Sequence, residues 1–368
     1  MKISLYKQGV WQDITQYVTM LTISGEYRTC CRTADFDIIQ SITDKNIKQL
    51  GINIGDIISA SENEKNMLYG KVWTKSKGTD GNTITLSIRD YGIYLLKNKA
   101  SYSFQGITPE AITAKIAADY NIKINKIMPT GVPITRKFLN TSLYQIIMTA
   151  YTLANDKKYI CVFDGEFLNV IEKGQFVSMP INSGFNLLTS NVSQSLESML
   201  NKVNVYNSKG VLLNTYKSDN DIKLYGVMSE NIKLVDDKEN YALKAQRMIK
   251  GVESKIKVTN FGDANYITGK SVVVTEPYTG IKGKFFIDED KHIWKNGIYT
   301  NALTLNYQNI MDEKQSGSEI NKTSSTSKSK KGYKDWRDDS PKKPKQGGSN
   351  GQPIYNSGFN DKLPGEQK

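Results

Sequence analysis

Short apolar segments separated by turn residues run through the first hundred residues and constrain the fold more than any other feature. Residues 20–97 contain MLTISGEY, ADFDIIQ, GDIISAS, MLYGKVW and TITLSIRD. In the last of these, Ile84, Leu86 and Ile88 alternate with polar residues, which is the period of a half-buried strand. Asp80-Gly81 supplies the positive φ that a tight hairpin requires. The pattern predicts an antiparallel sheet or barrel.

The period of the apolar residues changes after this sheet. Thr108 can cap a helix whose first turn contains Pro109, and apolar residues then recur every four positions. Ser142 and Gln145 form a capping-box pattern at the start of a second helix. The predicted buried residues are Ile112, Ile116 and Tyr120 in the first helix, and Leu143, Ile147, Ala150 and Ala154 in the second. A hairpin around Asp164-Gly165 completes a small α+β module.

A second strand-rich region begins near Gly184. It contains LNKVNVY, VLLNTY, VESKIKV, SVVVT, GKFFID and NALTLNY, which again predict an antiparallel sheet. One helix is expected inside this region, capped by Asp236 with Glu239 three residues later and closed by Gly251. After Met311 the chain becomes rich in Ser, Lys, Gly and Pro, and such a segment buries too little apolar surface to fold by itself.

The composition narrows the classes of function. The formal net charge is +12, yet no basic run is interleaved with aromatic residues as in a nucleic-acid surface, so solvated faces are the favoured interpretation. Cys30 and Cys31 are adjacent and Cys161 stands apart, which predicts no disulfide framework. The N-terminus lacks a signal-peptide pattern and no segment has the length of a membrane span, so we expect synthesis in the cytoplasm and no stable membrane insertion.

Catalytic patterns are sparse. His292 is the single histidine, and without a nucleophile motif we expect it to pack beside Trp294 and to bond a turn, rather than to act as a general base. The acids Asp288, Glu289 and Asp290 are expected to border a hairpin, and Asp236, Asp237 and Glu239 to cap a helix. Asp219 to Asp221 lack the spacing of a calcium loop, and no glycine motif forms a phosphate cradle. We predict no catalytic residue, metal or cofactor.

Residues 185–310 carry a family resemblance. The features are the strand ending KVNVY, Tyr225-Gly226, the Asp-started helix, the F-G-D of residues 261–263, and the H-x-x-x-x-G from His292 to Gly297. Together they resemble the PBSX-type (XkdQ-like) prophage tail proteins, which in turn resemble late-control protein D and the hubs of contractile-tail baseplates. Weaker similarity extends over residues 1–310 and includes the W-x-D-I-T that starts at Trp11.

The resemblance implies two barrels of the tail-tube type, each with a helix, in a mainly β chain. It also implies a homotrimeric baseplate hub of a phage tail, contractile injection system or bacteriocin particle. As a symmetry adaptor, it would join the hexameric tail tube to the central spike. The expected divisions are a first barrel (1–97), a connecting α+β module (98–184), a second barrel (185–311) and a flexible C-terminal arm (312–368).

Three functions follow as alternatives. The first is the non-enzymatic hub, in an extracellular virion or tail-like particle, with the tube protein, the spike and other baseplate proteins as partners. The second is a cell-wall hydrolase that uses His292 and its acidic neighbours, and the third is a nucleic-acid binder, which we do not expect. In the arm, Trp336, Tyr355 and Phe359 are predicted anchors for a spike or neighbouring hub protein, and an unused solubilising tail is the alternative.

Overall fold

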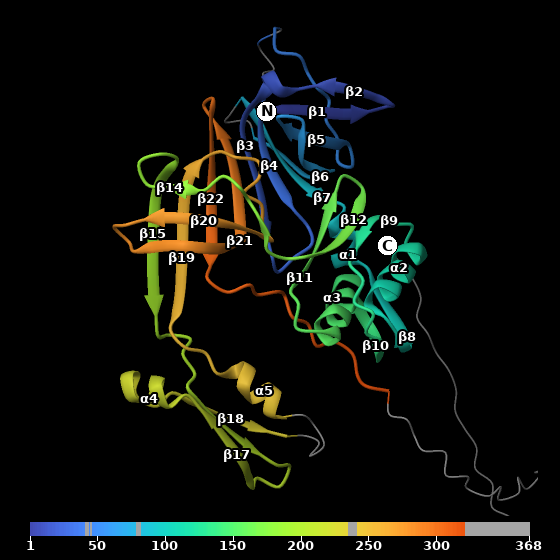
Figure 1. The fold of residues 1–368 in the computed structure, drawn as a ribbon. Coiled ribbons are helices and arrows are strands. Elements are labelled where there is room, and N and C mark those ends of the chain that lie inside the picture. Colours follow the sequence, from blue (N-terminus) through green and yellow to red (C-terminus); the bar gives the residue numbers. More distant parts are fainter. Residues whose placement is uncertain (41–43, 45, 79–81, 235–240, 321–368) are drawn as a thin grey trace, which may run out of the picture. The chain divides into compact units, whose positions relative to one another are not determined.

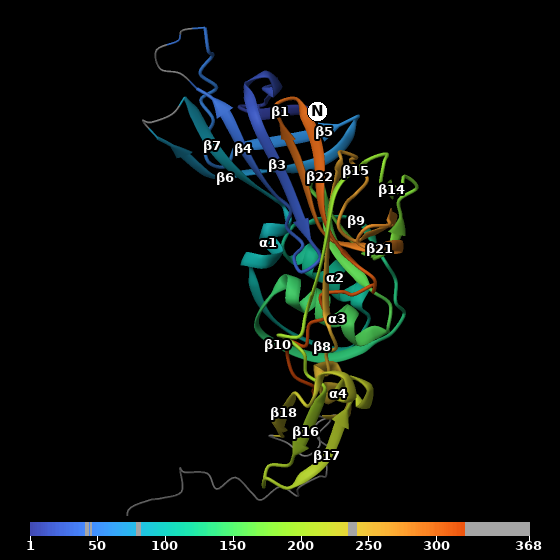
Figure 2. The same ribbon diagram turned by 90° about the vertical axis from the view of Figure 1, so that its left-hand side faces the viewer.

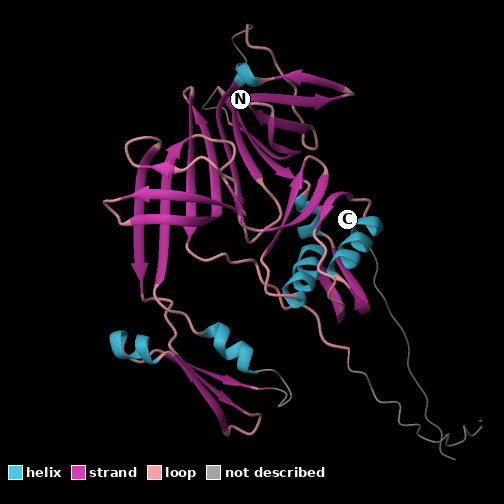
Figure 3. Cartoon of the chain, viewed as in Figure 1, coloured by secondary structure: helices cyan, strands magenta, loops and turns pink. Residues whose placement is uncertain are grey.

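The computed structural model describes residues 1–320 apart from 41–43, 45, 79–81 and 235–240. Strands greatly outnumber helices in this part of the chain (Figure 3). The prediction of a mainly β protein is therefore confirmed. The predicted Asp80-Gly81 turn, the Asp236 cap and residues 321–368 of the predicted C-terminal arm lie outside the described residues. Residues 312–320 do not belong to a flexible arm as predicted, because Ser318 exchanges backbone hydrogen bonds with Lys137 and Asp312 accepts a hydrogen bond from the Tyr144 hydroxyl.

The first β-unit is formed by the N-terminal strands. Its hydrogen-bonded order is β3-β4-β7-β6-β5-β1-β2, and each neighbouring pair is antiparallel. Alternate residues of these strands, among them Phe36, Leu86 and Ile88, are buried in one apolar core. The elements are β1 (Lys2–Lys7), β2 (Val10–Asp13), the 3₁₀ turn η1 (Thr15–Tyr17), β3 (Val18–Glu26), β4 (Thr33–Ile39), β5 (Ile57–Glu62), β6 (Lys65–Lys77) and β7 (Thr83–Asp90).

A helical module follows, and its two main helices begin where the sequence predicts. Helix α2 starts at Pro109 with Thr108 as its N-cap, and the Ser142 hydroxyl accepts a hydrogen bond of 3.3 Å from the Gln145 N–H at the start of α3. The predicted hairpin around Asp164-Gly165 is also confirmed. The elements are α1 (Gly92–Lys97), β8 (Lys99–Ile107), α2 (Pro109–Asp119), β9 (Lys123–Ile127), β10 (Ile134–Ser142), α3 (Leu143–Ala154), β11 (Tyr159–Asp164) and β12 (Phe167–Glu172).

The second β-unit has its own apolar core, which includes Tyr266, Phe285 and Leu303. Strands β15, β19, β22 and β21 are consecutive neighbours, and β20 pairs with the first half of β21. The short strands β13 and β14 run parallel to β20, so this sheet is not wholly antiparallel as predicted. The elements are β13 (Gln175–Phe176), β14 (Ile181–Asn182), β15 (Leu187–Ser195), β19 (Glu253–Phe261), β20 (Lys270–Glu276), β21 (Ile281–Lys295) and β22 (Ile298–Asn306).

The segments KVNVY and LLNTYK do not join that sheet, contrary to our expectation. They form β16 and β17 of a separate three-stranded sheet in an insertion between β15 and β19, where β16 runs parallel to β18. The insertion has its own small core around Val203, Val205 and Ala245. Alternation of apolar residues predicts a strand but not its partner. The elements are β16 (Lys202–Tyr206), β17 (Leu212–Lys217), α4 (Asp219–Tyr225), β18 (Ser229–Lys233) and α5 (Tyr241–Met248).

Strand β21 belongs to both β-units. Its first half pairs with β20, and its second half, Glu289–Lys295, pairs with β3 of the first unit. Figures 1 and 2 show the long strands β3, β21 and β22 running beside one another. The two β-units are thus joined through continuous backbone hydrogen bonding. The domain divisions at residues 97, 184 and 311 stay a prediction.

Candidate functional site

Two buried ion pairs lie where β21 passes from one β-unit to the other. Arg32 Nη1 and Nη2 donate to the two carboxylate oxygens of Asp290 at 3.0 and 2.5 Å. Lys173 Nζ donates to Asp288 Oδ1 at 2.6 Å, and its ammonium also lies 4.6 Å from the centre of the Tyr27 ring. A register shift in β21 between Ile287 and Glu289 allows the adjacent residues Ile287 and Asp288 both to be buried. From the sequence we expected Asp288, Glu289 and Asp290 to border a hairpin. This expectation was wrong, because all three lie within β21.

Electrostatics favours the charged form of Asp290. Burial alone would raise the pKa of this carboxyl, but the charge of Arg32 and the contacts with His292 hold the pKa well below its usual range. The backbone N–H of Thr268 donates to Asp290 Oδ1 at 2.7 Å and satisfies the same oxygen as Arg32. The Arg32–Asp290 ion pair therefore joins the loop before β4 in the first β-unit to β21 and to the loop before β20 in the second.

His292 lies in the middle of β21 and is fully buried. Its Nδ1 accepts a hydrogen bond from the Asn301 amide at 2.9 Å and lies 2.7 Å from the Tyr299 hydroxyl. The ring proton is then on Nε2, which is 3.1 Å from Asp290 Oδ2 without the alignment of a hydrogen bond. Burial lowers the pKa of the imidazole, so it is neutral. The ring lies beside Trp294 as expected, with ring centres 6.1 Å apart, but its hydrogen-bond partners Tyr299 and Asn301 lie in β22 and not in the turn that we expected.

This arrangement does not suit a wall hydrolase. The side chains of Asp290 and His292 are both 0% exposed, and a catalytic acid or base must reach its substrate. In the described part of the chain, no group of three or more His, Cys, Asp or Glu residues has the geometry of a metal site.

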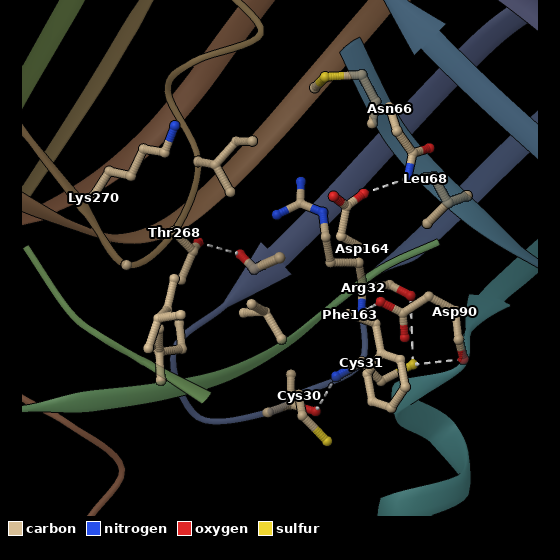
Figure 4. A pocket seen from close by; sticks show the side chains of 18 of the residues that line it. Cys30, Cys31, Arg32, Asn66, Leu68, Asp90, Phe163, Asp164, Thr268 and Lys270 are labelled. Carbon is tan, nitrogen blue, oxygen red and sulfur yellow. Dashed lines mark hydrogen bonds between the residues drawn. The ribbon is translucent and has the colours of Figure 1, made fainter. Parts of the chain in front are cut away.

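A cavity of about 270 Å³ opens beside the Arg32–Asp290 pair, and we call it the junction pocket. Its walls come from the loop before β4, from β6, from the β11–β12 hairpin and from the loop before β20. Figure 4 shows Arg32 near its centre, Lys270 on one wall, and Asn66 with Asp164 on another. Asn66 Nδ2 donates to Asp164 Oδ1 at 2.9 Å. Sequence reasoning missed this pocket, because its walls are far apart along the chain.

All three cysteines lie near this region, in the core of the helical module or at its edge, and are free. Burial raises the pKa of the Cys30 and Cys31 thiols well above the usual range. Cys161 stands apart in sequence but shares a buried apolar cluster with Cys30.

Aromatic side chains form a continuous row across the first β-unit and α1. Trp11 lies 5.1 Å from Tyr6 and 6.2 Å from Tyr69, measured between ring centres. Tyr91 continues the row at 5.9 Å from Tyr69 and 5.8 Å from Tyr94. The Trp11 side chain is 47% exposed. Exposed aromatic residues are typical of protein interfaces, where an apolar ring and a polar tip both find partners.

Other large apolar side chains remain exposed on the second β-unit and on the insertion. Phe185 is 66% exposed, Leu224 70% and Tyr278 96%. No helix in the described residues has the length and apolar character to cross a membrane. The predicted anchors Trp336, Tyr355 and Phe359 lie outside the described part and stay a prediction.

Comparison with known proteins gives consistent matches. The family model described as YQBQ-like matches residues 21–306. The phage-like element PBSX protein XkdQ of Bacillus subtilis is 24% identical and aligns over 85% of this chain and 98% of its own length.

Solved structures share the fold. A 43 kDa tail protein of prophage MuSo2 from Shewanella oneidensis has a TM-score of 0.69 at 14% identity, covering 85% of this chain and all of that one. A tail protein from Neisseria meningitidis has a TM-score of 0.62 at 15% identity, covering 85% and 99%.

Proposed function

The chain belongs to the YQBQ-like family of phage tail proteins, and from this premise we propose that it is the hub of a tail baseplate. In this proposal three copies form a ring that joins the sixfold tail tube to a threefold central spike. The protein acts by geometry and needs no catalytic site. It works in an extracellular virion or tail-like particle after synthesis in the bacterial cytoplasm.

The observation that carries the proposal is the presence of two strand-rich units, each with its own core, in one chain. A trimer of such chains offers six β-units to a hexameric tube while keeping threefold symmetry for a spike. The β21–β3 pairing fixes the two units to each other, as a ring of defined geometry requires. A flexible connection would let the six units drift out of register.

The free edges of the sheet are the proposed contacts between copies. In the described residues the strand path ends at β2 and at β15. Each edge strand exposes backbone hydrogen-bonding groups on one side, and such groups can pair with another chain. Leu188 on β15 is 44% exposed and Trp11 on β2 is 47% exposed, so apolar contacts accompany the edges.

The test is to count copies. We expect light scattering of the purified full chain, and quantitative mass spectrometry of isolated tails, to give three copies per assembly. Leu188→Lys should reduce the trimer, whereas Tyr278→Lys, at a side chain that is more exposed but outside the edge strand, should not. Six copies per tail, or a monomer absent from tails, contradicts the proposal.

The arm forms a separate part of the proposal. Trp336, Tyr355 and Phe359 are proposed to anchor it on a spike or neighbouring hub protein. Replacing all three by alanine should reduce recovery of spike protein with the purified hub, while replacing Lys328, Lys330 and Lys331 by glutamine should have a smaller effect. Equal recovery with the aromatic variant indicates a solubilising tail.

A further inference from the structure

Two lysines lie on the wall of the junction pocket. Lys65 begins β6 and Lys270 begins β20. The Lys65 ammonium donates to the Ala264 carbonyl and, at 3.0 Å, to the side-chain oxygen of Asn265. Within the described residues, neither lysine forms an ion pair with an acidic side chain, although Asp263 attracts both from further away. The charges of these two lysines are therefore not neutralised by direct ion pairs in the described residues, although four acidic residues also line the pocket.

The two lysines are also close enough to affect each other. Burial, and after it the charge of Lys270, lowers the pKa of Lys65 to about 8. Arg32, whose charge is paired with Asp290, also lines the pocket, and its buried Nε has no hydrogen-bond partner among the described residues. Cations gathered at a partly dehydrated wall repel one another, and an anion placed between them would relieve that repulsion.

Three of the four acidic residues that line the pocket are already engaged, and the fourth, Glu26, is exposed at the end of β3. Asp164 accepts a hydrogen bond from Asn66, and Asp90 accepts from the backbone N–H groups of Arg32 and Gly92. Glu172 is paired with Lys157 at 3.2 Å. These contacts direct the carboxylates of Asp164, Asp90 and Glu172 to groups other than the two lysines, so these three residues leave the lysine pair available to a ligand.

The remaining walls are apolar. Met67 and Leu68 line one side of the pocket, and Ile160 and Phe163 line another. A fully hydrated ion such as inorganic phosphate gains nothing from these side chains, whereas an apolar group does. The volume of about 270 Å³ is slightly below that of most ligand pockets, which are typically about 300 Å³ or more, so only a small ligand fits.

We propose that the junction pocket binds a small amphipathic carboxylate, with the carboxylate between Lys65 and Lys270 and its apolar chain against Met67 and Phe163. This site is independent of the proposed hub function. Because its walls come from the first β-unit, the helical module and the loop before β20, a bound ligand would hold these three parts together. Occupancy would then stabilise the junction around the Arg32–Asp290 pair.

Titration calorimetry of the purified full chain with sodium octanoate tests the proposal, with inorganic phosphate as the comparison anion. We expect one octanoate per chain and much weaker binding of phosphate. Lys270→Met keeps an apolar side chain but removes the charge, and it should weaken octanoate binding by about tenfold, as expected for one charge-assisted hydrogen bond. Lys282→Met removes an exposed lysine charge on β21 and should change the affinity less than about twofold.

The melting temperature of each variant without ligand shows whether the variant is folded, so that a loss of binding is not mistaken for a loss of structure. Lys270→Met should melt no lower than the wild type, since it removes a repulsion rather than an ion pair. Absence of octanoate binding to the wild type overturns the proposal. So does phosphate binding as tight as octanoate binding, or an affinity unchanged by Lys270→Met.

Discussion

Arg32 and Asp290 are separated by 258 positions in the sequence, yet each terminal nitrogen of the guanidinium donates to a different oxygen of the carboxylate. The Asp290 side chain is 0% exposed and that of Arg32 is 12% exposed. The two charges are held where water cannot replace either partner. Removing one of them therefore costs more than the pair itself contributes to stability.

Arg32→Met should lower the free energy of unfolding by about 3–5 kcal/mol, because it leaves Asp290 buried without its main partner. Urea denaturation measures this loss. Lys115→Met, which breaks an exposed pair with Asp119, should cost no more than about 1 kcal/mol. The double variant Arg32→Met with Asp290→Leu should be more stable than Arg32→Met alone. If it is equally unstable or worse, the cost does not come from the unpaired charge.

Asp90 should make stability depend on pH. Burial raises the pKa of this carboxyl to about 6 in the folded chain, above its ordinary value of 3.8. The folded state then holds the proton more tightly, so this contribution to stability is complete below about pH 4 and is lost as pH rises through 6. A pKa shift of one unit corresponds to about 1.4 kcal/mol, so the shift from 3.8 to about 6 corresponds to a loss of about 3 kcal/mol in the free energy of unfolding.

Asp90→Asn is the matched variant, because its side chain is neutral at every pH. The stability of this variant relative to the wild type should increase between pH 4 and pH 7, measured by urea denaturation at each pH. Both proteins contain His292 and the same other acidic residues, so the titration of these groups cancels in the difference between the two free energies of unfolding. A constant difference across this range contradicts the raised pKa.

Gly92 is required by close backbone packing. A methyl group at this position would lie 2.1 Å from the carbonyl oxygen of Cys30. Gly92→Ala should therefore lower the free energy of unfolding by about 1–3 kcal/mol through overpacking. At Gly251 the nearest atom to an added methyl is 3.9 Å away, and Gly251→Ala should not destabilise the chain. Similar melting temperatures for the two variants would exclude this cause.

The three cysteines should react slowly while the chain is folded. Cys30, Cys31 and Cys161 are buried, and a thiol must reach solvent as a thiolate to react. With a thiol reagent at pH 8, we expect little labelling of the native protein and three equivalents after unfolding in urea. Tyr278→Cys, which introduces a thiol at a highly exposed position, should add one equivalent that reacts at once.

Local signals in the sequence predicted the local structure well. The Thr108-Pro109 and Ser142–Gln145 patterns act within one helical turn, and the hairpin at Asp164-Gly165 is set by its own residues. The β-rich character also followed from alternation. Such features depend on neighbours in the chain, which a single sequence displays.

Long-range pairing was not predictable in the same way. The alternation of apolar and polar residues is similar in all these strands. It therefore gave no indication that β3 pairs with β21, or that β16 and β17 belong to a separate sheet. Asp288 and Asp290 looked like turn acids because their partners, Lys173 and Arg32, are distant in sequence. The lysines of the junction pocket are also far apart, and only the folded chain brings them together.

The sharing of β21 by both β-units has a consequence for synthesis. Strand β3 is complete after residue 26, but the strand that covers its outer edge extends from 281 to 295. During translation, most of the chain therefore emerges while β3 keeps one edge unpaired. An exposed edge can pair wrongly with other chains, and pairing over so long a loop is slow. The nascent protein thus depends on its last strands to close its first unit, and chains released before residue 281 are open to aggregation.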